Sequence, residues 1–208
     1  MTVIAIGINH NTAPVALREK VAFTPDAMTD AFASLQTVEP VASSVVLSTC
    51  NRTELYIQLN DTVESNDFLV RWLADFHQCD YDELAKHIYI HQDVAALNHI
   101  MRVASGLDSL ILGEPQILGQ VKQAVSDAKR HDALNTQFKR IFDNTFQVAK
   151  KVRTDTDIGA NAVSVAFAAV QLAKQIFGDL ARSRVLLIGA GETIDLVAKH
   201  LHEQGAVN

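Results

Sequence analysis

The spacing of apolar residues in the first part of the chain switches between the period of a β-strand and that of an α-helix. Four short runs rich in Val, Ile and Leu predict strands, at residues 2–8, 45–49, 54–59 and 87–91. Two segments carry apolar residues at helical spacing, 25–35 and 67–78. Thr24 followed by Pro25 is typical of a helix start, because the hydroxyl can cap the helix and proline suits its first position.

The predicted order of these elements is βαββαβ, so residues 1–92 are expected to form a ferredoxin-like unit of an α+β fold. The pattern then becomes helical over residues 93–158. Three helices are predicted there, from Gln92 or Asp93 to about Gly106, over 117–129 and over 136–153. We expect this part to be a helical subdomain appended to the first unit.

The last part, residues 159–208, begins with a long alanine-rich helix predicted over 160–177. A strand over 185–188, a glycine turn and a helix over 193–202 follow, and this order is that of the first βα unit of a Rossmann-type fold. The turn is expected to bind a dinucleotide cofactor through six residues, Gly189, Ala190, Gly191, Glu192, Thr193 and Ile194.

Ile194 stands where the general dinucleotide fingerprint has its third glycine, so that fingerprint is incomplete. The sequence stops at Asn208, where the second strand of the fold would begin. We therefore expect a truncated cofactor domain, with the residue that selects between NAD and NADP lying further along the chain.

Composition sets the class of protein. The chain has 208 residues, 48% of them hydrophobic, and can bury a sizeable core. Two cysteines are too few for a disulfide framework, and no long apolar run predicts a membrane span or an export signal, so we expect a soluble cytoplasmic protein. The net charge of -6 disfavours non-specific binding to polyanions, so a nucleic acid would have to be bound by a local patch or by shape.

Cys50 is the candidate nucleophile. It follows an apolar run, and polar residues surround it, namely Ser48, Thr49, Asn51 and Arg52. A nearby cation increases the fraction of a thiol that is ionised, and the thiolate is the reactive form. A lone cysteine is more often a small buried apolar side chain, but this polar setting favours chemistry.

Three stretches together resemble the glutamyl-tRNA reductase family, the enzymes that open tetrapyrrole and haem synthesis from glutamate. The stretches are Gly7–Pro14 with Arg18–Lys20, Ser48–Glu54, and Gly106–Gln120. The glycine turn at 189–192 lies where that family carries its NADPH site. The resemblance covers the whole chain and implies an NADPH-dependent oxidoreductase of the cytoplasm.

The reaction that the resemblance implies has two stages. The cysteine thiolate attacks the ester of glutamyl-tRNA, releases the tRNA and leaves a thioester on the protein. Hydride from NADPH then reduces the thioester to a thiohemiacetal, which collapses to glutamate-1-semialdehyde. A thioester accepts hydride better than an oxygen ester, which suits the use of sulfur. Because the cofactor domain is expected to be truncated, we expect this chain to lack the full hydride step.

The resemblance also implies roles for individual residues. Cys50 is the nucleophile and His99 orients the ester or assists proton transfer. Arg52 pairs with the glutamyl carboxylate and can stabilise the thiolate. The other substrate-binding residues implied are Thr49, Asn51, Ser109, Glu114, Pro115, Gln116 and Gln120, with Glu114 a candidate for the substrate ammonium.

Helical geometry places His99 away from the predicted apolar stripe of its helix, which consists of Val94, Leu97, Met101 and Ala104. A histidine in that position is ordinarily exposed or hydrogen-bonded, so its catalytic role rests on the resemblance. No metal site is expected, since His87 and His91 lie in a predicted strand without a matching cluster of ligands.

The one basic concentration runs from Lys139 and Arg140 to Lys150, Lys151 and Arg153. It is either a solvated helix face or a surface that meets tRNA phosphates. The resemblance further implies a homodimer formed through a C-terminal region absent from this sequence, and transfer of the aldehyde to the next enzyme. Two other functions stay open: a thiol-dependent acyltransferase or esterase, and a non-catalytic module that binds tRNA or a nucleotide.

Overall fold

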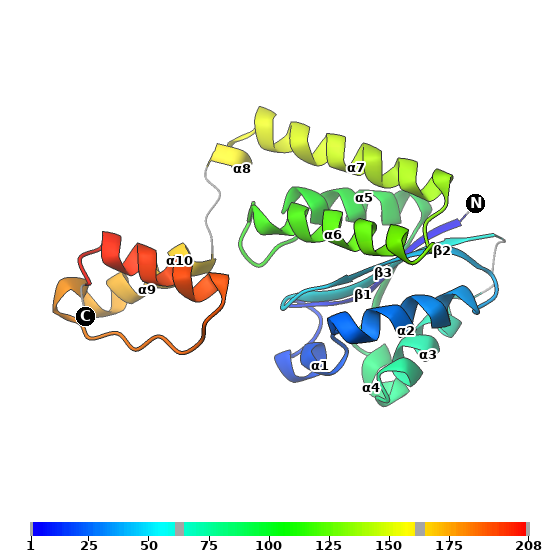
Figure 1. Cartoon of the computed structure of the whole chain (residues 1–208), viewed down its shortest axis with the longest axis horizontal. Helices are drawn as coiled ribbons and strands as arrows, with labels where there is room; N and C mark the ends of the chain where they lie inside the picture. The colour runs from blue at the N-terminus through cyan, green and yellow to red at the C-terminus, as the bar shows by residue number, and fades with distance from the viewer. Residues whose placement is uncertain (1, 61–64, 161–164, 207–208) are drawn as a thin grey trace.

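The computed structural model of the chain describes residues 2–60, 65–160 and 165–206 (Figure 1). It is a mixed α+β structure built on one antiparallel sheet. The strands are β1 (Thr2–Asn9), β2 (Val41–Ser48), β3 (Arg52–Leu59) and β4 (Tyr89–Gln92), in the spatial order β2-β3-β1-β4. β3 therefore lies between two neighbours, and every one of its residues is buried.

Helices cover both faces of this sheet, so that its strands are enclosed (Figure 1). One face carries α1 (Val15–Lys20), α2 (Pro25–Gln36), α3 (Asp67–Phe76) and α4 (Tyr81–Ala85). The other face carries α5 (Asp93–Ser105), α6 (Gln116–Arg130) and α7 (Thr136–Asp155). A continuous apolar core joins the sheet to both layers and includes side chains from Val3 to Ala149.

Local signals place several of these elements where the sequence predicted them. Thr24 caps α2, since its Oγ1 accepts a hydrogen bond from the Ala27 N–H at 3.3 Å. Gly106 ends α5 with a φ of 78°, a left-handed conformation that glycine adopts without strain. The predicted helices over 117–129 and 136–153 correspond to α6 and α7.

The strand boundaries differ from the prediction at β3. Arg52 and Thr53 were expected in a connection because they are polar, but they are the first residues of the strand. They pair with Asn9 and Ile8 of β1. Two buried polar side chains in a central strand require partners that a local pattern does not reveal.

The C-terminal part consists of α8 (Asp157–Ala160), α9 (Val165–Phe177), the short 3₁₀ helix η1 (Leu180–Arg182) and α10 (Glu192–Glu203). Residues 161–164 of the long helix predicted over 160–177 lie outside the described residues. A second, smaller apolar cluster centred on Val170, Leu180 and Leu201 joins α9 to α10.

The prediction of a β-strand over residues 185–188 is wrong. The segment forms no strand, and Leu186 and Ile188 are 82% and 83% exposed. A strand is defined by hydrogen bonds to a neighbour, and no described segment pairs with this one. The run of apolar residues therefore indicates a segment that favours burial, but the described part of the chain does not bury it. None of the described helices has the length and apolar character needed to cross a membrane.

Candidate functional site

Cys50 lies at the tip of a tight connection between β2 and β3. Thr49 closes this connection: its N–H donates to the Arg52 carbonyl at 2.8 Å, and its Oγ1 accepts from the N–H groups of Asn51 and Arg52 at 3.2 and 3.1 Å. The Cys50 thiol is free and exposed. The sequence thus holds a thiol in solvent on a backbone fixed by its own neighbours.

Arg18 holds the same connection from outside. Its Nη1 donates to the Cys50 carbonyl at 2.5 Å, and its Nε donates to the Ala13 carbonyl at 3.3 Å. No carboxylate among the described residues pairs with Arg18. Sequence reasoning missed this role, although Arg18 belongs to the first motif, because a hydrogen bond to a carbonyl 32 residues away has no local signal.

A cleft of about 120 Å³ adjoins the cysteine. It brings together the predicted nucleophile Cys50 and five predicted substrate-binding residues, Thr49, Asn51, Glu114, Gln116 and Gln120. Ala166, Thr193 and Leu196 complete the lining, so the start of α10 faces the thiol across the cleft. Thiol, amide and carboxyl groups are therefore within reach of one small molecule.

Three of the predicted substrate-binding residues do not line this cleft. Pro115 is exposed at the start of α6. Ser109 is half-buried, and its Oγ has no hydrogen-bond partner. Arg52 is almost fully buried, at 1% exposure, beneath the cysteine connection.

Arg52 is engaged by two carboxylates of the protein. Its Nη1 donates to Glu54 Oε1, and its Nη2 lies 3.0 Å from Asp108 Oδ2. Burial alone would lower the pKa of Arg52, but the Glu54 carboxylate beside it more than offsets this and raises the pKa. The guanidinium is therefore a permanent buried cation, and it does not approach the thiol as a free charge.

Glu54 is the centre of a buried polar network. Its two carboxylate oxygens meet four donors: Arg52 Nη1, the Tyr56 and Tyr89 hydroxyls at 2.5 Å each, and His99 Nε2 at 3.2 Å. Burial favours the neutral acid, but the bonds from His99 and Arg52 outweigh it and lower the pKa of Glu54 to about 2. Burial and the Glu54 charge raise the pKa values of Tyr56 and Tyr89, which stay protonated donors. Glu54 and Asp108 lie within the second and third stretches of the resemblance, but neither of them was assigned a role from the sequence.

His99 is buried at 8% exposure, so the prediction that it lies off the core face of its helix is wrong. The buried face of α5 contains Ala96, Ile100 and Val103, whereas Val94, which was assigned to the apolar stripe, is 71% exposed. The physical reason is Glu54, which supplies a polar partner on the sheet and makes burial of an imidazole favourable. His91 and Tyr89 stack near the ring, at 4.7 and 5.2 Å between centroids.

The glycine turn before α10 leaves the start of this helix open. Gly189 has a φ of 133°, and a Cβ there would lie 3.1 Å from the Ile194 side chain. Gly191 is the N-cap residue of α10, so no side chain caps the first N–H groups of this helix. Nothing lies within 4 Å of the position that a Cβ at Gly191 would take. Open space beside uncapped N–H groups at a helix start suits an anion.

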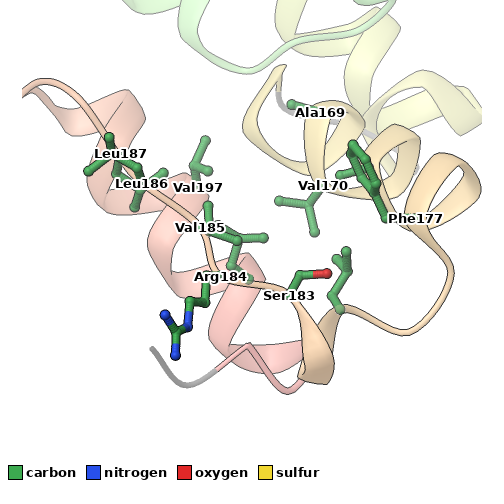
Figure 2. A pocket seen from close by; sticks show the side chains of 12 residues that line it. Ala169, Val170, Phe177, Ser183, Arg184, Val185, Leu186, Leu187 and Val197 are labelled. Atoms are coloured by element: carbon green, nitrogen blue, oxygen red, sulfur yellow. The ribbon is translucent and has the colours of Figure 1, made fainter.

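A larger cavity of about 490 Å³ lies between α9, η1 and α10, away from Cys50 (Figure 2). Figure 2 shows mostly aliphatic side chains around it, among them Val170, Val185 and Val197, with Phe177 at its edge. It offers no cluster of ionisable groups. In the part of the chain that the structure describes, no group of three His, Cys, Asp or Glu side chains could hold a metal ion.

Comparison with known sequences gives two family matches. Residues 6–156 match the family described as "Glutamyl-tRNAGlu reductase, N-terminal domain". Residues 171–208 match the family "Shikimate / quinate 5-dehydrogenase". The first match covers the sheet from the middle of β1 onward and the helices α1 to α7, and the second covers the second half of α9 and all of α10.

Similar proteins agree with these matches. The chain is 62% identical to the glutamyl-tRNA reductase of Pseudoalteromonas atlantica over 205 residues, which is 99% of this chain and 48% of that protein. It is 57% identical to that of Pseudoalteromonas translucida, over 100% of this chain and 49% of that protein. Among solved structures, glutamyl-tRNA reductase from Methanopyrus kandleri matches with a TM-score of 0.66 and 34% identity, covering 98% of this chain and 47% of that one. The chain thus spans about half the length of the relatives it matches.

Proposed function

This chain belongs to the glutamyl-tRNA reductase family, and on that basis we propose that it carries the acyl-transfer site for NADPH-dependent reduction of glutamyl-tRNA to glutamate-1-semialdehyde. The observation that carries the proposal is the exposed Cys50 thiol on a fixed connection beside a polar cleft. In the first step the Cys50 sulfur bonds to the ester carbonyl carbon. The bond from that carbon to the tRNA 3′ oxygen then breaks, and tRNA leaves with a proton on that oxygen.

The residues around the cleft divide the work of binding. Thr49 and Asn51 offer polar groups to the amino acid from the cysteine side, and Glu114, Gln116 and Gln120 do so from the opposite wall. Ser109 and Pro115 belong to the same proposed binding region through the segment that leads into α6. Glu114 receives the substrate ammonium, for which its charge is suited.

His99 orients the ester or assists proton transfer in this proposal, and Arg52 binds the glutamyl side-chain carboxylate. Glu54 supports both, because its carboxylate fixes His99 Nε2 and Arg52 Nη1 at the same time. Because the pKa of Glu54 is lowered to about 2, its carboxylate is charged at neutral pH and can hold both partners.

The residues present fit NADPH, which supplies the hydride for the second step when bound. Gly189 and Gly191 leave room for its phosphates at the amino end of α10, with Ala190, Glu192 and Ile194 in the same turn. Thr193 lies in the lining of the cysteine cleft, which supports a cofactor position close to Cys50. We assign residues 159–208 to the beginning of this Rossmann-type domain.

The other two parts keep the predicted division, with a ferredoxin-like unit over 1–92 and a helical part over 93–158. The strand order β2-β3-β1-β4 with helices between the strands supports the ferredoxin-like classification. We place the whole protein in the cytoplasm and in tetrapyrrole synthesis, as a homodimer that hands its aldehyde to the next enzyme.

A glutamyl-tRNA substrate needs a surface for its phosphates, and α7 offers one. Arg140, Lys150 and Lys151 are exposed on this helix. Lys139 is paired with Asp143 at 2.7 Å, and Arg153 donates to the Glu114 carbonyl, so these two cations are less available. Reversing the charge of Lys150 and Lys151 should weaken tRNA binding at low salt, measured by filter binding. Unchanged affinity would remove α7 from the proposed tRNA surface.

The test of the function is transfer of radiolabelled glutamate from glutamyl-tRNA to the protein. We expect label to be retained on the wild type and on Cys79→Ser, the matched control at the second cysteine, and to be lost in Cys50→Ser. Circular dichroism shows whether each variant is folded. Retention of label by folded Cys50→Ser would contradict the assignment of the nucleophile.

The same experiment separates the alternative functions. Rapid release of free glutamate without NADPH would favour a thiol-dependent esterase. Binding of glutamyl-tRNA without any label on the protein would favour a non-catalytic tRNA-binding module.

A further inference from the structure

Asp108 pairs with the Arg52 guanidinium, which is the group that binds the substrate carboxylate in the proposed function. Its Oδ2 lies 3.0 Å from Arg52 Nη2, and its backbone carbonyl accepts from the same nitrogen. Asn9 Nδ2 donates to the same Oδ2 at 3.5 Å. Because the Arg52 side chain is only 1% exposed, a substrate carboxylate cannot reach it while Asp108 is in place.

Asp108 is the exchangeable one of the two carboxylates on Arg52. Glu54 already neutralises the guanidinium, and its side chain is 0% exposed and bonded to three further donors. Asp108 is a second anion beside the same cation, and its side chain is 23% exposed. Returning the Asp108 carboxylate to water therefore costs less than removing Glu54, which would leave a buried charge uncompensated.

The segment that carries Asp108 is a loop closed at its base. It runs over residues 106–113, between α5 and α6, and both of its terminal glycines have a φ of 78°. The Gly113 N–H donates to the Gly106 carbonyl at 2.8 Å and closes the base of the loop. Leu110 and Leu112 on this loop are 53% and 60% exposed, so little apolar packing opposes its displacement.

We propose that Asp108 mimics the substrate: its carboxylate keeps Arg52 paired in the empty site and is displaced by the side-chain carboxylate of the glutamyl group. The proposal rests on the proposed function, since it takes Arg52 as the carboxylate-binding residue. One carboxylate replaces another, so the charge around the buried guanidinium is conserved. The free energy needed to release Asp108 from Arg52 reduces the net binding free energy of the acyl group. The apparent affinity for the acyl group is therefore the intrinsic affinity multiplied by the fraction of molecules in which Asp108 is released.

The test uses Asp108→Asn, which keeps the shape of the side chain and removes its charge. Single-turnover transfer of label from glutamyl-tRNA, followed over a range of protein concentrations, gives a half-saturating concentration and a limiting rate. We expect the half-saturating concentration to fall about tenfold and the limiting rate to stay within about twofold. Asp30→Asn is the matched control, because Asp30 is exposed on α2 and its loss changes the net charge equally.

Uncharged tRNA and a second variant make the outcome unambiguous. The affinity for uncharged tRNA should be the same in the wild type and in Asp108→Asn, because only the acyl group meets Arg52. If Asp108→Asn fails to fold, Asp108→Ser takes its place, and we expect the same fall in half-saturating concentration. The shift should also be seen in equilibrium binding of glutamyl-tRNA on a Cys50→Ser background, which requires no chemistry.

Two results would overturn the proposal. A higher half-saturating concentration in Asp108→Asn would mean that Asp108 supports Arg52 in the complex. An equal gain in affinity for uncharged tRNA would mean that the effect is general electrostatics. Loss of cysteine-dependent labelling in the wild type would count against the proposed function instead, and the binding measurement on the Cys50→Ser background would still decide the role of Asp108.

Discussion

Replacing Glu54 by glutamine tests the buried network most directly. The substitution keeps the shape of the side chain but removes the anion that faces Arg52, Tyr56, Tyr89 and His99. All four partners donate, so the amide NH₂ of glutamine would face donors, and one or more bonds would be lost. Arg52 would remain buried with the partly exposed Asp108 as its remaining anion.

The magnitude follows from the lowered pKa of Glu54 and from the general cost of breaking a buried ion pair. The pKa of Glu54 is lowered from 4.5 to about 2, so the folded protein favours the charged form by about 3 kcal/mol. Removing one partner of a buried ion pair costs about 3–5 kcal/mol. We therefore expect Glu54→Gln to reduce the free energy of unfolding by about 3–5 kcal/mol, which is a large share of the stability of a typical domain.

Urea denaturation at pH 7, followed by fluorescence, measures this loss. Trp72 is the only tryptophan and packs against Phe23 and Phe76, so its emission reports the core beneath the sheet. Tyr89→Phe is a graded control that removes one donor and should cost about 1.5–3 kcal/mol. A Glu54→Gln protein within about 1 kcal/mol of the wild type would refute the account of Glu54 as the centre of the network.

Three further perturbations probe other parts of the structure. Gly7→Ala should lower the free energy of unfolding by about 1–3 kcal/mol, since a Cβ at Gly7 would lie 2.3 Å from the Thr53 carbonyl; unchanged urea midpoints would contradict the close approach. Burial lowers the pKa of His77 to about 4 while the unfolded chain titrates near 6.5, so only the unfolded state takes up the proton as pH falls. The wild type should lose about 2 kcal/mol of stability between pH 7 and pH 5 through this group, and His77→Gln should lose correspondingly less; equal losses would argue against His77. Arg18→Met should slow label transfer to Cys50 about tenfold with little change in stability, and Arg18→Lys should partly restore it; a normal rate in Arg18→Met would show that the carbonyl contact is dispensable.

The architecture of the sheet could be predicted because its determinants are local. Apolar runs, the Thr24 cap and the terminal glycine of α5 lie within a few residues of the structure that they specify. The strand over 185–188 could not be predicted in the same way, because apolar composition shows that a segment favours burial and does not show that a partner strand is present. The short helices α1 and α4 carry too few residues for a periodic signal.

The site residues could be predicted only where they lie together in a contiguous sequence motif. The connection around Cys50 and the start of α6 could be paired from the resemblance, and both line one cleft. The support behind them could not, because Arg52 meets Asp108 across 56 positions and His99 meets Glu54 across 45. The orientation of His99 was predicted wrongly for the same reason: its burial depends on a partner that lies on another element.

The enclosed position of β3 makes the part of the site that lies on this strand rigid. Its amide groups bond to β1 and β2 on both sides, and helices cover both faces of the sheet (Figure 1). Hydrogen exchange of such amides requires an opening as large as global unfolding. Arg52 and Glu54 therefore lie in the slowest-exchanging part of the fold, while Cys50 immediately precedes it in solvent. Adjustment to a bound acyl group therefore has to come from segments outside β3, such as the loop at 106–113, whose Asp108 pairs with Arg52.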